Sequence, residues 1–187
     1  MGAMARPSIR NARPRDMVIS LGVILVPVVL ISWFFTRTPP DAPVRTVDWQ
    51  QVLTSSRQVA PFPLLGPVGL PTTWVATKAE WATTGQPAVN REPAPGNTWQ
   101  LGMLTPDKVY VSLTQRDAAG PALVAQISRN GRADGSSSIG GASWTRWVSS
   151  DDRTRTISRV DGAVTIVVSG DLSYDGLDAF ASTLRSA

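Results

Sequence analysis

The sequence predicts an α+β protein in which one N-terminal transmembrane helix is followed by a single extracytoplasmic domain. Three observations support this fold class. Residues 17–36 form an apolar run without a charged residue, and from residue 72 onward short alternating segments are separated by turn residues. A C-terminal segment has helical periodicity. Consecutive strands with tight turns predict an antiparallel meander sheet of about six strands, with about three covering helices.

The apolar run from Met17 to Phe35 is long enough to cross a bilayer. As a helix that rises about 1.5 Å per residue, it spans roughly 28 Å, close to the thickness of the hydrocarbon core. Pro27 lies in the middle of the run and predicts a mild kink. The aromatic residues expected to anchor the helix at the membrane interface are Trp33, Phe34 and Phe35.

The net positive charge of the chain lies beside this run. The net charge is +4, and residues 1–37 hold five arginines against one aspartate, so the rest of the chain is neutral. A neutral domain gives no basic surface for phosphates, and we expect no nucleic-acid partner. The positive-inside rule places the N-terminus in the cytoplasm and the domain outside. The arginines that set this topology are Arg6, Arg10, Arg13 and Arg15.

A cleaved signal peptide is the main alternative to a permanent anchor. Its apolar region has about 7–15 residues and ends at an A-x-A site, and neither property is found here. The chain also has no cysteine for lipid attachment. We therefore expect a signal-anchor in the cell membrane, with a basic cytoplasmic tail over residues 1–16, a proline-rich linker over 37–47 and the domain over 48–187. The 16 arginines against two lysines hint at a GC-rich bacterial genome and a cell envelope.

A short helix is predicted to open the domain. Asp48 is the expected N-cap. Trp49, Val52 and Leu53 share one helical face, as in a helix packed on a core. Prolines between residues 61 and 71 then exclude regular structure, so the chain is expected to cross the domain in an extended form.

The segments after residue 72 are mostly those of β-strands. Pro106-Asp107 is expected to form one turn, and Asp161-Gly162 suits a type I′ turn because both positions tolerate positive φ. Residues 131–141 are rich in Gly and Ser and predict a loop. The predicted strands are residues 73–81, 98–105, 108–115, 143–149, 153–160 and 163–169.

Two further helices are predicted in this part of the chain. The first covers residues 121–129, with Pro121 in its first turn and Gly131 as its stop. The second covers residues 174–184, because apolar residues recur at i, i+3, i+4 and i+7 from Leu177. Together with the helix near Asp48, they are expected to cover one face of the sheet.

The chain lacks the side chains of common catalytic sites. It contains no cysteine and no histidine, which excludes disulfides, cysteine nucleophiles, Cys/His zinc sites and imidazole-based triads. The aspartates match no calcium-loop pattern. We therefore predict no enzyme, no catalytic residue, no cofactor and no metal. A hydrolase that uses serine or paired aspartates is an unfavoured alternative, which substitution of Asp151, Asp152 or Lys108 would test.

The chain contains seven tryptophans, and their placement needs an explanation. Trp81 lies seven positions after Trp74, so the two should face opposite sides of a strand. Trp147 lies three positions after Trp144, which gives the same result. A tryptophan on the outer face is either covered by a helix or exposed as a patch for an apolar molecule. Trp81 and Trp147 are the predicted contacts with a partner or ligand.

Four stretches follow one another in an order that is typical of a known family. They are a proline-rich segment that ends in tryptophan (61–74), a Trp-x-x-Gly strand pair (99–115), a Gly-x-x-Trp segment (141–144) and a closing segment from Arg to Leu (159–184). This order resembles the DUF4245 family of actinobacterial single-pass membrane proteins of unknown function. The resemblance implies a membrane location and a compact outer domain, and it supplies no activity and no catalytic residue. Trp147 is not part of the family pattern.

These observations favour a membrane-anchored, non-catalytic extracytoplasmic domain of the bacterial cell envelope. Its expected partners are the lipid bilayer and an envelope protein complex or an apolar envelope molecule. One alternative is an accessory subunit of a larger membrane complex that associates through its transmembrane helix, although the span has no small-xxx-small motif.

Overall fold

The computed structural model describes residues 14–35, 45–87 and 92–186. The chain divides into two compact units, Met1–Pro43 and Val44–Ala187. Residues 1–13 of the predicted basic tail, which include Arg6, Arg10 and Arg13, lie outside the described residues, as does most of the predicted linker. The last three residues of the predicted tail belong to the first helix.

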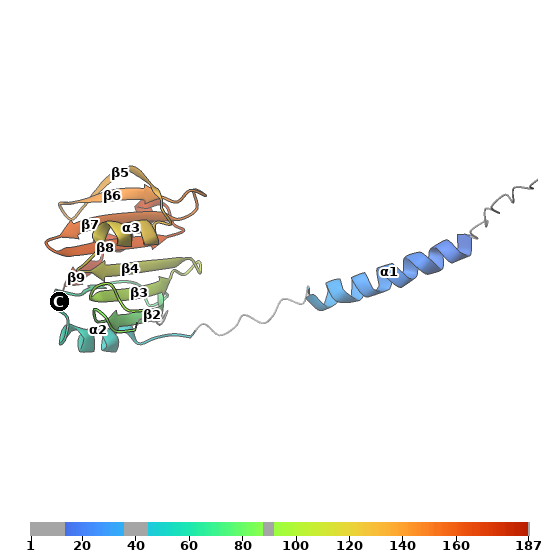
Figure 1. Cartoon of the computed structure of the whole chain (residues 1–187), viewed down its shortest axis with the longest axis horizontal. Helices are drawn as coiled ribbons and strands as arrows, with labels where there is room; N and C mark the ends of the chain where they lie inside the picture. Colours follow the sequence, from blue (N-terminus) through green and yellow to red (C-terminus); the bar gives the residue numbers. More distant parts are fainter. Residues whose placement is uncertain (1–13, 36–44, 88–91, 187) are drawn as a thin grey trace, which may run out of the picture. The chain divides into compact units, whose positions relative to one another are not determined.

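The described part of the first unit is one helix, α1 (Pro14–Phe35), drawn in blue in Figure 1. The large apolar side chains of this helix that the structure describes are all exposed, from 48% for Leu25 to 73% for Met17. Arg15 and Trp33 are exposed as well, whereas the side chains of Phe34 and Phe35 are outside the described set. Among the residues that the structure describes, no helix combines the length and the apolar character needed to cross a membrane.

The second unit is built on a seven-stranded antiparallel sheet in the order β2-β3-β4-β8-β7-β6-β5 (Figure 1). The α+β class is confirmed, but the sheet is not the single meander that was predicted. Two meanders, β2 to β4 and β5 to β8, join where β4 pairs with β8. The strands are β2 (Val75–Ala82), β3 (Thr98–Leu104), β4 (Tyr110–Arg116), β5 (Arg132–Ile139), β6 (Ala142–Val148), β7 (Arg155–Asp161) and β8 (Val164–Gly170).

The central place of β8 follows from its composition. All seven of its residues are buried. A strand buried on both faces reads as a continuous apolar run rather than as an alternation, and it belongs in the middle of a sheet. The six predicted strands are all present, with ends that differ from the prediction by at most two residues.

One strand of this sheet lies where a loop was predicted. Residues 131–141 contain β5, an edge strand that is mostly exposed. Its register against β6 shifts between Ala133 and Ser136, where Gly135 has a positive φ of 91°. The Gly/Ser composition is typical of a loop, and it is pairing with β6 that makes the segment a strand.

A second, two-stranded sheet was also missed. The helix predicted to reach Leu184 ends earlier, and Leu184–Ser186 forms β9. This strand pairs with β1 (Leu65–Pro67), which lies in the proline-rich stretch where regular structure was excluded. Each of these two strands has only three residues, and its partner lies far away in the sequence. Neither strand therefore has a local periodicity that would predict it.

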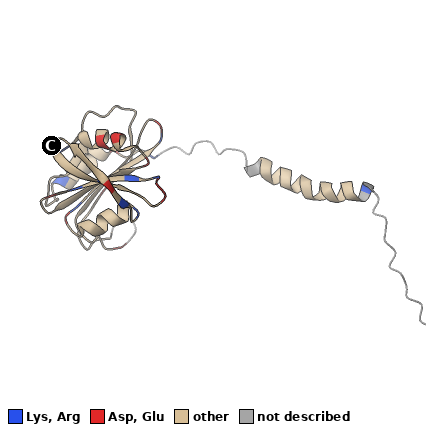
Figure 2. Cartoon of the chain, turned by 90° about the horizontal axis from the view of Figure 1, so that it is seen from above, with Lys and Arg blue, Asp and Glu red and all other residues tan. Residues whose placement is uncertain are grey.

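Helices lie on both faces of the sheet, whereas one face was predicted (Figure 2). On one face, Leu53 and Phe180 from two helices join the main core. On the other face, Leu123 of a third helix packs against Val167. Val167 and Val168 are neighbours on β8 and are both fully buried, so each face needs a cover. These helices are α2 (Trp49–Arg57), α4 (Tyr174–Ser182) and α3 (Gly120–Ile127).

The helix ends agree with the sequence in part. The N-cap of α2 is Asp48, whose side chain accepts a hydrogen bond from the backbone N–H of Gln51 at 3.2 Å. Pro121 lies in the first turn of α3, as predicted. Gly131, however, is not the residue that ends α3, because Arg129 and Asn130 take the left-handed backbone, with φ of 57° and 54°.

The hairpin between β7 and β8 has a different turn from the one predicted. Asp161 pairs with Val164, so the two turn residues are Gly162 and Ala163. Gly162 has a φ of 60° and Ala163 has no positive φ. This is the pattern of a type II′ turn, which places glycine first, rather than of type I′.

Candidate functional site

The two faces of the sheet differ in chemistry over β2, β3 and β4. On the core face, β3 carries buried apolar residues such as Leu101. On the opposite face, Gln100 stands beside Glu80 of β2 and Thr114 of β4. The helix on this side, α3, contacts β8 and β7. We name this polar surface the open face; it is defined by Lys78, Glu80, Thr98, Gln100, Ser112, Thr114 and Arg116.

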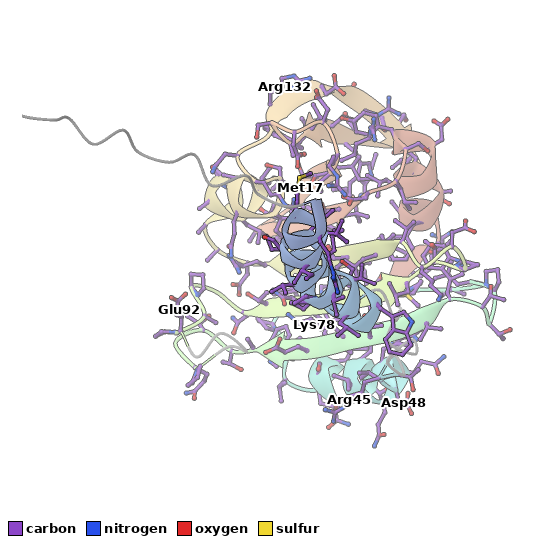
Figure 3. All side chains as sticks on the ribbon, turned by 90° about the vertical axis from the view of Figure 1, so that its right-hand side faces the viewer. Met17, Arg45, Asp48, Lys78, Glu92 and Arg132 are labelled. Atoms are coloured by element: carbon purple, nitrogen blue, oxygen red, sulfur yellow. The ribbon has the colours of Figure 1, made fainter. Side chains whose placement is uncertain are left out.

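A cavity of about 440 Å³ lies on the open face. Residues from β2, β3 and β4 line it, together with residues 92–95 and Gln126 of α3. Its volume is within the range of small-molecule sites. Lys78 and Glu92, which both line it, are labelled in Figure 3. A smaller hollow of about 180 Å³ shares Lys78 and Gln100 with it and continues along α3.

Arg116 is the most deeply buried charged residue of this cavity, with 7% of its surface exposed. Its Nε donates to the hydroxyl oxygen of Thr98 at 2.9 Å, and that hydroxyl donates to the Gly96 carbonyl at 2.8 Å. Burial lowers the pKa of Arg116, and the charge of Asp117 opposes this shift. Within the described residues, no acceptor bonds to its Nη1 or Nη2.

Asp117 follows Arg116 in the sequence but is held by another residue. Its two carboxylate oxygens accept from the backbone N–H and the side-chain Nδ2 of Asn97, at 2.9 and 2.6 Å. The side-chain oxygen of Asn97 accepts the Thr84 N–H at 3.1 Å, so this pair closes the base of the loop between β2 and β3. A Cβ at Gly96 would lie 2.8 Å from the Ala118 Cβ, so glycine lets this loop pack closely beside Arg116.

Lys78 and Glu80 line another side of the cavity. The Lys78 ammonium donates to the side-chain oxygen of Gln100 and lies 3.4 Å from the Glu80 carboxylate. Among the residues that the structure describes, the lining has two cations, Lys78 and Arg116, and two anions, Glu80 and Glu92. Amide and hydroxyl groups lie between these charges.

The smaller hollow ends at Tyr110. An added Cβ at Gly102 would lie 2.2 Å from the Tyr110 hydroxyl, which means that the tyrosine covers the bare backbone of Gly102. Burial against the sheet raises the pKa of Tyr110. The Tyr110 ring on β4 thus fills the space that a side chain at Gly102 on β3 would otherwise take.

The predicted contacts Trp81 and Trp147 lie on opposite faces of the sheet, and both are half-buried. Trp81 packs against the main core with its ring centroid 5.8 Å from that of Phe62. Trp147 packs beside Leu123 on the face of α3, and its Nε1 donates to the Ser158 hydroxyl at 2.8 Å. Neither residue lines the 440 Å³ cavity.

Trp74 does not face away from Trp81 as the spacing predicted. It precedes β2 and stacks on Phe180 of the main core, with ring centroids 5.5 Å apart. The register of β2 shifts between Ala76 and Lys78, and this bulge breaks the alternation on which the prediction depended. Both tryptophans consequently pack on the core side.

A second polar cluster joins α4 to the sheet. The Tyr174 hydroxyl donates to Asp134 at 2.7 Å, and the guanidinium of Arg146 lies 4.7 Å from the ring centroid of Tyr174. Arg146 also pairs with Asp178 of α4 at 2.9 Å. Burial and the contact with Asp134 raise the pKa of Tyr174 to about 12. These contacts clamp α4 against β5 and β6.

The carboxylates weighed as hydrolase candidates lie in a turn. Asp151 accepts from the Ser149 hydroxyl at 2.5 Å, which lowers the pKa of its carboxyl, and Asp152 pairs with Arg132 at 2.9 Å. Lys108 has a positive φ of 60° in the turn before β4. No group of three or more acidic, histidine or cysteine residues able to hold a metal ion is found in the described ranges.

The second unit is thus an α+β domain in which α2 and α4 cover one face of the sheet. On the other face, α3 covers β7 and β8, and the polar part over β2, β3 and β4 contains a cavity. The chain belongs to the family described as "Protein of unknown function (DUF4245)", which matches residues 10–184. The resemblance seen in the sequence is confirmed for this family. Comparison with curated proteins found no match, and comparison with solved structures found none either.

The residues that line the cavity were not predicted from the sequence. A signal was present in β4, where Ser112 and Thr114 alternate with the apolar Val111 and Leu113. Alternation indicates which face is polar, but it does not indicate which polar face stays without a helix. That depends on where α3 packs.

Proposed function

We propose that this protein is a membrane-anchored, non-catalytic binding domain of the bacterial cell envelope that takes a polar ligand in the cavity of the open face. The observation that supports it is the cavity of about 440 Å³ beside α3, with charged, amide and hydroxyl groups in its lining. Ligand sites typically combine such concavity with a few polar groups that fix orientation.

The polar lining of the cavity argues against one partner expected from the sequence, an apolar envelope molecule. An apolar envelope molecule would desolvate the Arg116 guanidinium and the ion pair of Lys78 with Glu80 without offering them a hydrogen-bond partner, which is costly. A polar molecule, or a polar group of a protein partner, would replace the water that these groups lose. The proposed ligand is therefore polar.

The proposed anchor is the helix α1. Its support is the uninterrupted apolar sequence, which includes Phe34 and Phe35, and the exposure of every described large apolar side chain. Exposed apolar surface costs about 25 cal/mol per Å² in water, and a bilayer removes that cost. The arginines before the helix support a cytoplasmic N-terminus and an outer domain.

The non-catalytic part of the proposal is based on the sequence. The chain has neither histidine nor cysteine to act as a base or nucleophile near neutral pH. The cationic side chains of the open face, Lys78 and Arg116, suit binding and orientation of an anion.

A substitution that fills the cavity tests the binding function. Gln126 is an exposed residue of α3 that lines the cavity, so Gln126→Trp should block it without disturbing the core. Ala122→Trp, at an exposed position of the same helix that does not line the cavity, is the matched control. Polar small molecules from bacterial envelopes are screened by thermal shift against the full chain in detergent micelles.

We expect ligands that raise the melting temperature of the wild type and of Ala122→Trp, but not of Gln126→Trp. Ligands that stabilise all three proteins equally would place binding elsewhere on the molecule. A screen without any cavity-dependent ligand would count against the binding function.

A further inference from the structure

We infer that the cavity receives a carboxylate group of a small polar ligand and that the Arg116 guanidinium is the group that binds it. This inference rests on the proposed function and specifies the chemistry of its ligand. It follows from the burial of Arg116, the engagement of its neighbours and the charge balance of the lining.

The first step is that Arg116, which lines the cavity, has N–H donors without a partner among the described residues. A guanidinium carries five N–H donors. Arg116 is 7% exposed, and its Nε donates to Thr98. Its Nη1 and Nη2 groups bond to none of the residues that the structure describes. Four of the five N–H groups are thus available to a ligand.

The second step is that the nearby carboxylates serve other groups. Asp117 receives two hydrogen bonds from Asn97. Glu80 lies 3.4 Å from Lys78. Over the described residues, no ion pair joins Arg116 to a carboxylate. The charge of Asp117 still acts on Arg116, but no described carboxylate accepts a hydrogen bond from the guanidinium, so its remaining N–H groups can donate to a ligand.

The third step is the orientation of the guanidinium. The Thr98 hydroxyl donates to the Gly96 carbonyl, so it can only accept from Arg116. This bond fixes the Nε side of the guanidinium and leaves the edge with Nη1 and Nη2 for a ligand. Two parallel N–H groups on one edge match the two oxygens of a carboxylate.

The fourth step separates a carboxylate from a phosphate. The described lining holds as many acidic as basic side chains, so it suits a ligand with one negative charge better than a ligand with two. A carboxylate has a single charge, which Arg116 alone can balance. Gln100 gives its side-chain oxygen to Lys78, so its NH₂ group can serve as a donor to other oxygens of the ligand.

The experiment measures binding of small carboxylates to the full chain in detergent micelles by isothermal titration and by the Nε–H signals of arginine in NMR spectra. The probes are N-acetylalanine, as an amino-acid carboxylate, and glucuronate, as a sugar carboxylate. N-acetylalanine amide and inorganic phosphate are the comparison compounds. The relative affinity of the two carboxylates distinguishes the two sources of the group.

We expect at least one carboxylate to bind, to shift the Arg116 signal, and to bind at least about tenfold more tightly than the amide and phosphate. In Arg116→Gln the affinity should fall about tenfold or more, whereas Arg153→Gln, at an exposed position outside the cavity, should bind like the wild type. If Arg116→Gln does not fold, Thr98→Val decides, with an expected loss of at least about threefold.

Binding of the amide or of phosphate as tightly as the carboxylates would overturn the inference, as would unchanged carboxylate affinity in Arg116→Gln or, where that variant does not fold, in Thr98→Val. Failure of both carboxylates to bind would do the same. In these cases the proposed function still stands if Gln126→Trp abolishes binding of some other polar ligand. If no ligand depends on the cavity, the proposed function fails as well.

Discussion

The buried charge of Arg116 lowers the stability of the domain, and the same charge is the proposed binding group of the cavity. Its charge is buried, and Thr98 gives it one hydrogen bond. Groups held in such a setting often serve binding at some expense in stability. The effect of Arg116 on stability can be measured separately from its effect on ligand binding.

Arg116→Met removes the buried charge and keeps a side chain of similar length. We predict that it raises the free energy of unfolding by about 1 kcal/mol, because burial disfavours this charge more than Asp117 favours it and only the Thr98 hydroxyl oxygen loses a donor. Urea denaturation of the full chain in micelles measures this change. A loss of stability would mean that Arg116 is mainly a structural residue.

Tyr174 provides a prediction on pH dependence. Its pKa is raised from 10.0 to about 12, so the folded state holds this proton more tightly than the unfolded chain. The resulting stability is complete below about pH 10 and is lost as the pH rises toward 12. The wild type should therefore lose more stability over this range than Tyr174→Phe. Tyr110 stays in both proteins, so its own titration cancels in the comparison.

At the scale of elements, the helices and strands that have a clear local periodicity were predicted from the sequence. The six strands and the helices at Asp48, Pro121 and Tyr174 were found because their alternation, caps and breakers lie within a few residues. The pairing of β1 with β9 and the strand β5 could not be predicted, because tertiary contacts stabilise them. The placement of α3 on the opposite face, which leaves the cavity open, has the same cause.

The loop between β2 and β3 forms a wall of the cavity and depends on the pair Asn97 and Asp117. Asn97→Ala removes a donor to Asp117 and the acceptor of the Thr84 N–H. We predict a loss of about 1–2 kcal/mol in stability and faster hydrogen exchange in residues 83–87 and 92–97, with unchanged exchange in β7 and β8. Uniform acceleration across the sheet would instead indicate global destabilisation.

At the scale of the whole molecule, the proposal combines an anchor with an outer binding domain. We predict that protease added to intact cells degrades residues 44–187, while the segment that contains α1 stays in the membrane fraction. Antibodies against the two ends of the chain measure this outcome. A chain that resists protease until the cells are lysed, or that is released intact into the medium, would contradict the topology.

The role of α1 can be separated from that of the domain. If an unrelated transmembrane segment replaces α1 and the chain keeps its function in a deletion strain, the helix is only an anchor. Loss of function in that chimera would favour the alternative of an accessory subunit that associates through its helix.

The cavity of the open face is the centre of this account, and native mass spectrometry of the full chain, released from micelles after gentle purification from its own membrane, tests it most directly. The account predicts a small molecule bound to the wild type and to Ala122→Trp and absent from Gln126→Trp. The same mass of bound material in all three proteins, or none in any of them, would contradict it.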